Sequence, residues 1–202
     1  DDEIVVVDNG SGMKEDILEA ALALGVDMGF AHSDKSRKGQ FGLGMKTACA
    51  SLGHEWAVFT RPIGDNKELR VVFDLDDWSR RSRENKSWEV EIESMSPDGN
   101  CPLKNAGHGT AIVIRRLRQK NILVGAVHEH LCEAYKAHLQ QGDKIFVNDS
   151  LAIPKPIDLI KGSQVNIDIP LEPGSPNRII GWVGVDKEIH NKGDYGFSIF
   201  RK

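Results

Sequence analysis

The sequence predicts an α/β fold of two layers, in which helices cover one mixed but mainly antiparallel sheet. A β-branched run at residues 3–8 is followed by apolar residues at helical spacing over 14–24. After a second helical segment at 44–52, four stretches with strand-like composition follow one another, at 55–61, 68–75, 87–94 and 109–116. Strands in close succession beside helices are typical of a two-layer sandwich.

Composition limits the classes of function. The 202 residues, 40% of them apolar, are enough for one good core and part of a second domain. The net charge of -4 offers no general attraction to nucleic acid, and no apolar run reaches the roughly 20 residues that span a bilayer. Three widely spaced cysteines, Cys49, Cys101 and Cys132, favour a reducing, cytoplasmic setting.

The first strand ends in "VVVDNGSGM", where Asp8 precedes Gly10, Gly12 and Met13. A carboxylate at the end of a buried strand needs a hydrogen-bond partner or a ligand, because an unpaired one is costly. Two glycines one residue apart indicate that something approaches the backbone closely. The alternative is a simple turn in which the glycines supply positive φ.

A second group of glycines lies between the two predicted helices. Residues 25–42 are Gly-rich and basic and show no sustained period, which predicts a long loop. Glycines in front of a helix, with a lysine on its first turn, suit a phosphate chain. The spacing fits neither a Walker loop nor a dinucleotide fingerprint. The candidate residues are Gly39, Gln40, Phe41, Gly42, Leu43, Gly44, Met45 and Lys46. For Lys46, the alternative is a solvated helix lysine.

A third element, "GHGTAIVI", places Gly109 and Thr110 at the start of an alternating strand. The Thr110 hydroxyl could point at the same place as the Asp8 carboxylate, although threonine is also a common strand residue.

The rest of the chain carries weaker signals. A helix is predicted over 121–139, a hairpin with its turn at Asn148 and Asp149, a proline-rich linker over 153–177 and strands after it. The basic run at 80–86 reads as a solvated loop, with a DNA contact as the alternative. His128, His130 and Cys132 do not share one helix face, which argues against zinc.

In order along the chain, Asp-x-Gly-x-Gly-Met, Gly-x-x-Gly-x-Gly-x-Lys and Gly-Thr on a strand resemble the nucleotide-binding motifs of the GHKL superfamily. This superfamily includes DNA gyrase, the ninety-kilodalton heat-shock chaperones, histidine kinases and MutL, and it has the Bergerat fold. Within it, "SDKSRKGQFGLGMKTACASLG" is most similar to MORC-type ATPases and their bacterial relatives. The resemblance implies an ATP-binding domain over 1–160 and the beginning of a transducer-like domain over 161–202.

The resemblance also implies roles for the motif residues. Asp8 would accept a hydrogen bond from the adenine amine, with Thr110 holding a water or the carboxylate nearby. Gly10 and Gly12 would let the backbone pass under the base, and Met13 would pack on its face. The glycine segment with Lys46 would form a lid and phosphate cradle for ATP or ADP with Mg²⁺.

One departure from the family is expected to matter. Relatives carry a catalytic Glu and a magnesium-binding Asn on a helix before the first strand, and a lysine donated by the transducer domain. The sequence starts at Asp1, after the place of that helix, so we expect an excised part of a larger ATPase with no catalytic residue of its own.

The function that the resemblance implies is binding of Mg-ATP that drives lid closure and homodimerisation. The localisation it implies is cytoplasmic, or nuclear in a eukaryote. No membrane partner is expected, and nucleic acid remains open for the parent protein. The alternatives are a histidine-kinase catalytic domain and a nucleotide-sensing module that does not hydrolyse ATP.

Overall fold

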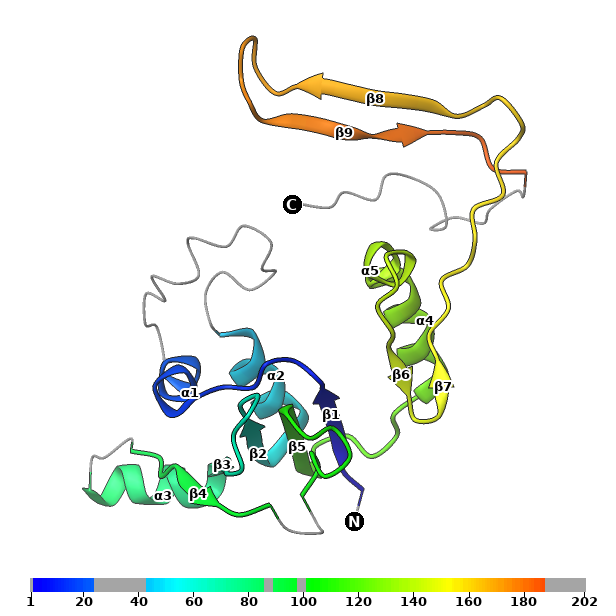
Figure 1. The fold of residues 1–202 in the computed structure, drawn as a ribbon. Helices are drawn as coiled ribbons and strands as arrows, with labels where there is room; N and C mark the ends of the chain where they lie inside the picture. The colour runs from blue at the N-terminus through cyan, green and yellow to red at the C-terminus, as the bar shows by residue number, and fades with distance from the viewer. Residues whose placement is uncertain (1, 24–42, 86–88, 98–100, 188–202) are drawn as a thin grey trace. The chain divides into compact units, whose positions relative to one another are not determined.

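The computed structural model describes residues 2–23, 43–85, 89–97 and 101–187 (Figure 1). The chain divides between Ile122 and Leu123 into two compact units. This boundary lies before residue 160, where the resemblance places the end of the ATP-binding domain. The division into an ATP-binding and a transducer-like domain therefore stays a prediction.

The first unit is built on one five-stranded sheet with the order β1-β5-β2-β3-β4, and every neighbouring pair is antiparallel. Together with the helices on this sheet, it confirms the predicted two-layer fold class. The strands are β1 (Ile4–Asp8), β2 (Gly53–Arg61), β3 (Glu68–Asp74), β4 (Glu93–Met95) and β5 (Gly109–Leu117).

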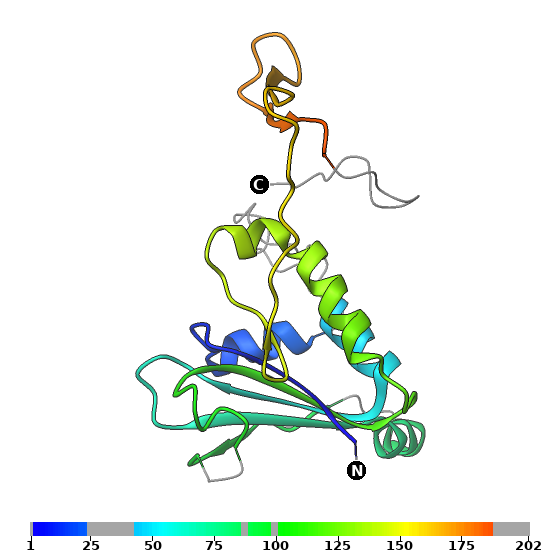
Figure 2. The ribbon, with the colours of Figure 1, turned by 90° about the vertical axis from the view of Figure 1, so that its right-hand side faces the viewer.

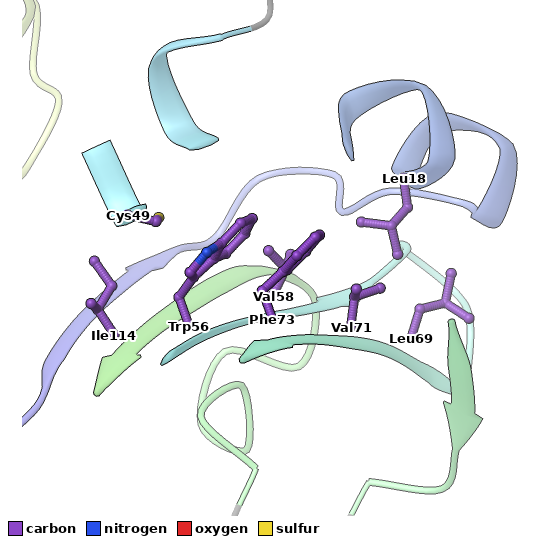
Figure 3. Packing of buried hydrophobic residues seen from close by; sticks show 8 residues of the cluster. All are labelled: Leu18, Cys49, Trp56, Val58, Leu69, Val71, Phe73 and Ile114. Atoms are coloured by element: carbon purple, nitrogen blue, oxygen red, sulfur yellow. The ribbon is translucent and has the colours of Figure 1, made fainter. Parts of the chain in front are cut away.

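Two helices, α1 (Glu15–Leu22) and α2 (Gly44–Leu52), cover the same face of the sheet (Figure 2). Leu18 of α1 and Cys49 of α2 are buried against this face (Figure 3). Every second residue of each strand faces them, because successive side chains of a strand point to opposite faces of the sheet. The rings of Trp56 and Phe73 stack in this core, with centroids 4.0 Å apart. The buried members are Leu18, Cys49, Trp56, Val58, Leu69, Val71, Phe73 and Ile114.

Two predictions in this unit were wrong. The expected strand at 87–94 is reduced to β4, and Val90 and Ile92 instead pack against the core from an irregular segment. The supposed loop at 80–86 belongs largely to α3 (Leu75–Asn85). The Asp74 carboxylate caps this helix by accepting the backbone N–H groups of Asp76 and Asp77, both at 3.1 Å.

In the second unit, the expected helix over 121–139 is two helices, α4 (Val124–Ala134) and α5 (Lys136–Gln140). They are separated at Tyr135, whose φ of -108° and ψ of 14° are not helical. His128 uses both ring nitrogens: Nε2 donates to the Leu151 carbonyl at 3.2 Å, and Nδ1 accepts from the Cys132 thiol at 3.7 Å. These partners give the histidine a structural role.

Two hairpins complete the described part of this unit. The turn predicted at Asn148 and Asp149 is confirmed between β6 (Phe146–Val147) and β7 (Ser150–Leu151), and Asn148 has a positive φ of 51°. The second hairpin pairs β8 (Val165–Pro170) with β9 (Arg178–Val183). The predicted linker at 153–177 therefore contains the strand β8. Pro170 is tolerated because it stands at the end of this strand, where the missing backbone N–H costs least.

No helix in the described ranges is both long enough and apolar enough to cross a membrane.

Candidate functional site

Asp8, Thr110 and Thr60 form one row across three neighbouring strands. Asp8 of β1 stands opposite Thr110 of β5, which stands opposite Thr60 of β2. Directly opposed residues of antiparallel strands share a face. The row continues to Leu69, a member of the core, so these polar side chains lie on the helix-covered face.

The Asp8 carboxylate is held by one oxygen only. Its Oδ1 accepts the backbone N–H of Gly10 at 2.8 Å and that of Thr110 at 3.2 Å. No residue of the described segments donates to Oδ2, and the side chain is exposed. The carboxylate is thus fixed in position with one oxygen available to a donor from outside.

Thr60 is the centre of the site, and the sequence analysis missed it. Its hydroxyl is fully buried, donates to the Gly109 carbonyl at 3.1 Å and accepts the Met13 N–H at 2.8 Å. The Thr110 hydroxyl lies 3.3 Å away and donates to it, because the single proton of Thr60 is already used. Only the strand register brings these residues together, so no local sequence signal could have found Thr60.

Gly12 of the first motif and Gly109 of the third are required by the protein's own backbone. Gly12 has a φ of +68°, and a Cβ there would lie 2.0 Å from the Arg61 carbonyl oxygen. Gly109 has a φ of +120°, and its Cβ would lie 2.1 Å from the Asp8 carbonyl oxygen. The two turns are also joined by His108, whose Nδ1–H donates to the Gly10 carbonyl at 2.7 Å.

Lys46 has partners that the sequence did not suggest. Its side chain is buried, and the ammonium donates to the carbonyl oxygens of Ala21 and Ala23 at 2.8 and 2.7 Å. These carbonyls lie at the C-terminal end of α1, where a cation is favoured by the helix dipole. Burial lowers the pKa of Lys46.

The structure describes part of the second motif. Leu43 precedes α2, and Met45 packs against the core. Gly44 opens the helix, and no atom of the described residues lies within 4 Å of the position that a Cβ would take there. The candidates Gly39, Gln40, Phe41 and Gly42, with the rest of the predicted loop at 25–42, lie outside the described residues.

Residues 1–110 match the family described as histidine kinase-, DNA gyrase B-, and HSP90-like ATPase. The chain belongs to this family. A comparison with curated proteins found no match. The family confirms the predicted GHKL superfamily and implies ATP binding, and the matched residues include all three motifs up to Thr110. The similarity to MORC-type ATPases stays a prediction.

Proposed function

We propose that this chain binds Mg-ATP, or ADP, with the adenine at Asp8. In this proposal, ATP binding closes a lid formed by residues 25–41 and drives dimerisation of a GHKL-type ATPase. The observation that carries the proposal is the Asp8 carboxylate, which two backbone N–H groups hold by Oδ1 while Oδ2 accepts no hydrogen bond from a described residue. An exocyclic amine is a donor that suits this oxygen.

Thr110 supports the same assignment. Its hydroxyl proton is directed to Thr60, so its oxygen retains acceptor capacity next to Asp8. In the proposal, this oxygen orients a water that bridges to the base. Met13, held by its backbone N–H, packs partly against the core beside the same turn.

On the phosphate side, the proposal uses the backbone N–H groups of the first turn of α2, which have no acceptor within the helix, and requires Lys46 to exchange partners. The ammonium would leave the carbonyls of Ala21 and Ala23 for a phosphate oxygen. A hydrogen bond to a charged acceptor is roughly twice as strong as one to a neutral acceptor, which favours the exchange. Because Ala23 lies two residues before Gly25, where the predicted lid begins, this exchange would release the chain at the start of the lid when the triphosphate arrives.

Magnesium enters the proposal with the triphosphate, whose oxygens are ligands of the hard kind that Mg²⁺ prefers. Within the part of the chain that the structure describes, no cluster of three His, Cys, Asp or Glu side chains could hold a metal ion.

The test is calorimetric titration of ATP and ADP into the native chain and the Asp8→Asn variant. The amide replaces a charged acceptor and brings a competing donor. We expect affinity to fall by about 1.5 to 3 kcal/mol, or roughly 10- to 150-fold in Kd. Asp16→Asn, which removes the same charge from the exposed first turn of α1, is the matched control and should change nothing. Equal affinities of the native and Asp8→Asn chains would refute the adenine assignment.

A further inference from the structure

A polar cluster is buried on the sheet face opposite α1 and α2. Arg61 ends β2 and Glu68 begins β3, and both side chains lie near Cys101 from the segment that leads to β5. The three residues are 8%, 1% and 4% exposed. A charged pair buried this deeply is seldom retained for stability, because an apolar pair of similar volume often does as well.

Two donors within the cluster converge on one oxygen of its carboxylate. Glu68 Oε2 accepts Arg61 Nη2 at 3.1 Å and the Cys101 thiol at 2.5 Å. Burial and the adjacent Glu68 raise the pKa of Cys101, which keeps its proton available for this bond. The backbone N–H of Leu103 donates to the Cys101 sulfur at 3.2 Å and ties the following turn to the cluster.

Arg61 connects this cluster to both turns around Asp8. Its Nη1 donates to the Gly107 carbonyl at 3.1 Å, directly before His108, which holds Gly10. Its own carbonyl oxygen lies against Gly12 in the other turn. One residue therefore contacts the segment that supplies the Thr110 N–H and the turn that supplies the Gly10 N–H.

We propose that Arg61 is a positioning residue for the nucleotide site: through Gly107 it fixes the 107–110 segment, which places the Asp8 carboxylate for adenine. It does not touch the nucleotide. The inference rests on the proposed function, because it assumes that adenine binds at Asp8. By positioning this carboxylate, Arg61 would contribute to the affinity for adenine nucleotides. It would also contribute to the discrimination against guanine, which presents a carbonyl where adenine presents an amine.

The decisive variant is the double change Arg61→Met and Glu68→Met. It removes both buried charges together and replaces them with apolar side chains, so the free energy of unfolding should stay near the native value. The Gly107 carbonyl, however, loses its donor. We expect the Kd of both ATP and ADP to rise about tenfold, the factor that corresponds to one hydrogen bond, and the preference for ATP over GTP to fall.

Arg61→Lys is the second variant, and it retains the charge opposite Glu68. A single ammonium lacks the forked geometry that reaches Glu68 and Gly107 together, although it can still reach one of them. We therefore expect a smaller rise in Kd than in the double variant and a correspondingly smaller loss of ATP preference. Arg70→Met is the matched control. Arg70 lies over the ring of Phe59 and pairs with Glu93 at 3.7 Å, and this substitution should leave both nucleotide affinities unchanged.

The measurements are nucleotide titrations at a temperature where denaturation curves show each variant folded. Native affinity and native ATP preference in both the double variant and Arg61→Lys would overturn the inference. If the double variant does not fold, Arg61→Lys alone decides in the same way. A native chain that fails to bind ATP would contradict the proposed function instead, so the two failures are distinguishable.

Discussion

The substitution Gly12→Ala tests why a glycine is needed after Asp8. The sequence alone favours a close approach of the nucleotide, whereas the structure places the Arg61 carbonyl oxygen 2.0 Å from the position of the new Cβ. A φ of +68° adds a further penalty of roughly 1 to 2 kcal/mol for a residue with a side chain.

Relief of the contact requires the turn to move by more than an ångström, since a Cβ and a carbonyl oxygen need at least about 3 Å. Two hydrogen bonds next to Gly12 tie this turn to β2 and to the loop after it: Met13 N–H to the Thr60 hydroxyl at 2.8 Å and Ile63 N–H to the Ser11 carbonyl at 3.0 Å. At about 1 kcal/mol each, their loss brings the total to roughly 3 to 4 kcal/mol of unfolding free energy.

The assay is denaturant unfolding of the native chain, Gly12→Ala and the control Gly64→Ala. Gly64 has a similar φ of +80°, but among the residues that the structure describes no atom lies within 4 Å of the position that a Cβ would take there. Gly64→Ala should therefore show the backbone penalty alone, about 1 to 2 kcal/mol. The difference between the two variants measures the contact with Arg61.

Equal losses in the two variants would refute the reasoning from close contact. A Gly12→Ala chain with native stability and weakened ATP binding would instead support the explanation that the sequence suggested.

Two further predictions concern Lys46 and Thr60. Lys46→Met should weaken the end of α1, because the carbonyls of Ala21 and Ala23 lose their donor, and hydrogen exchange of α1 should rise. Burial lowers the pKa of Lys46 in the folded state, so the unfolded chain binds this proton more tightly. The unfolding free energy should accordingly rise as pH increases toward 10.5, and Lys46→Met should remove that rise in denaturation curves. Thr60→Val should cost about 1 to 3 kcal/mol in the same assay because it leaves the partly buried Met13 N–H without an acceptor, whereas Thr60→Ser, which retains the hydroxyl, should cost far less.

Local patterns were enough for several parts of the site. The β-branched run ends at Asp8 as predicted, and α2 spans the predicted Gly44–Leu52. The expectation that the first strand is buried was wrong, because β1 lies at the edge of the sheet and most of its residues are exposed. Thr110 also stands at the start of its strand and beside Asp8. In each case the signal is contained within a few consecutive residues: a strand run, a glycine before a helix, or a glycine before alternating apolar residues.

Features that depend on register or on side-chain capping escaped the sequence analysis. Thr60 looks like an ordinary strand threonine until β2 is aligned with β5. The helix α3 has few apolar residues, and its stability comes from the cap by Asp74 and from ion pairs such as Arg81 with Asp77 at 2.8 Å. The break between α4 and α5 at Tyr135 leaves no glycine or proline to mark it.

The register also explains how a partly exposed site is kept rigid. Asp8, Thr110 and Thr60 occupy the row that continues to Leu69, and the row two residues further along runs through Val58 and Val71 of the core. The polar row therefore borders the packed rows of this face at Thr60, whereas Val6, the neighbour of Asp8 in the adjacent row, is exposed. From the opposite side of the sheet, Arg61 restrains the turn that supplies the Thr110 amide. A carboxylate held in this way loses little conformational entropy when a donor binds it, which is the condition under which one hydrogen bond can discriminate between bases.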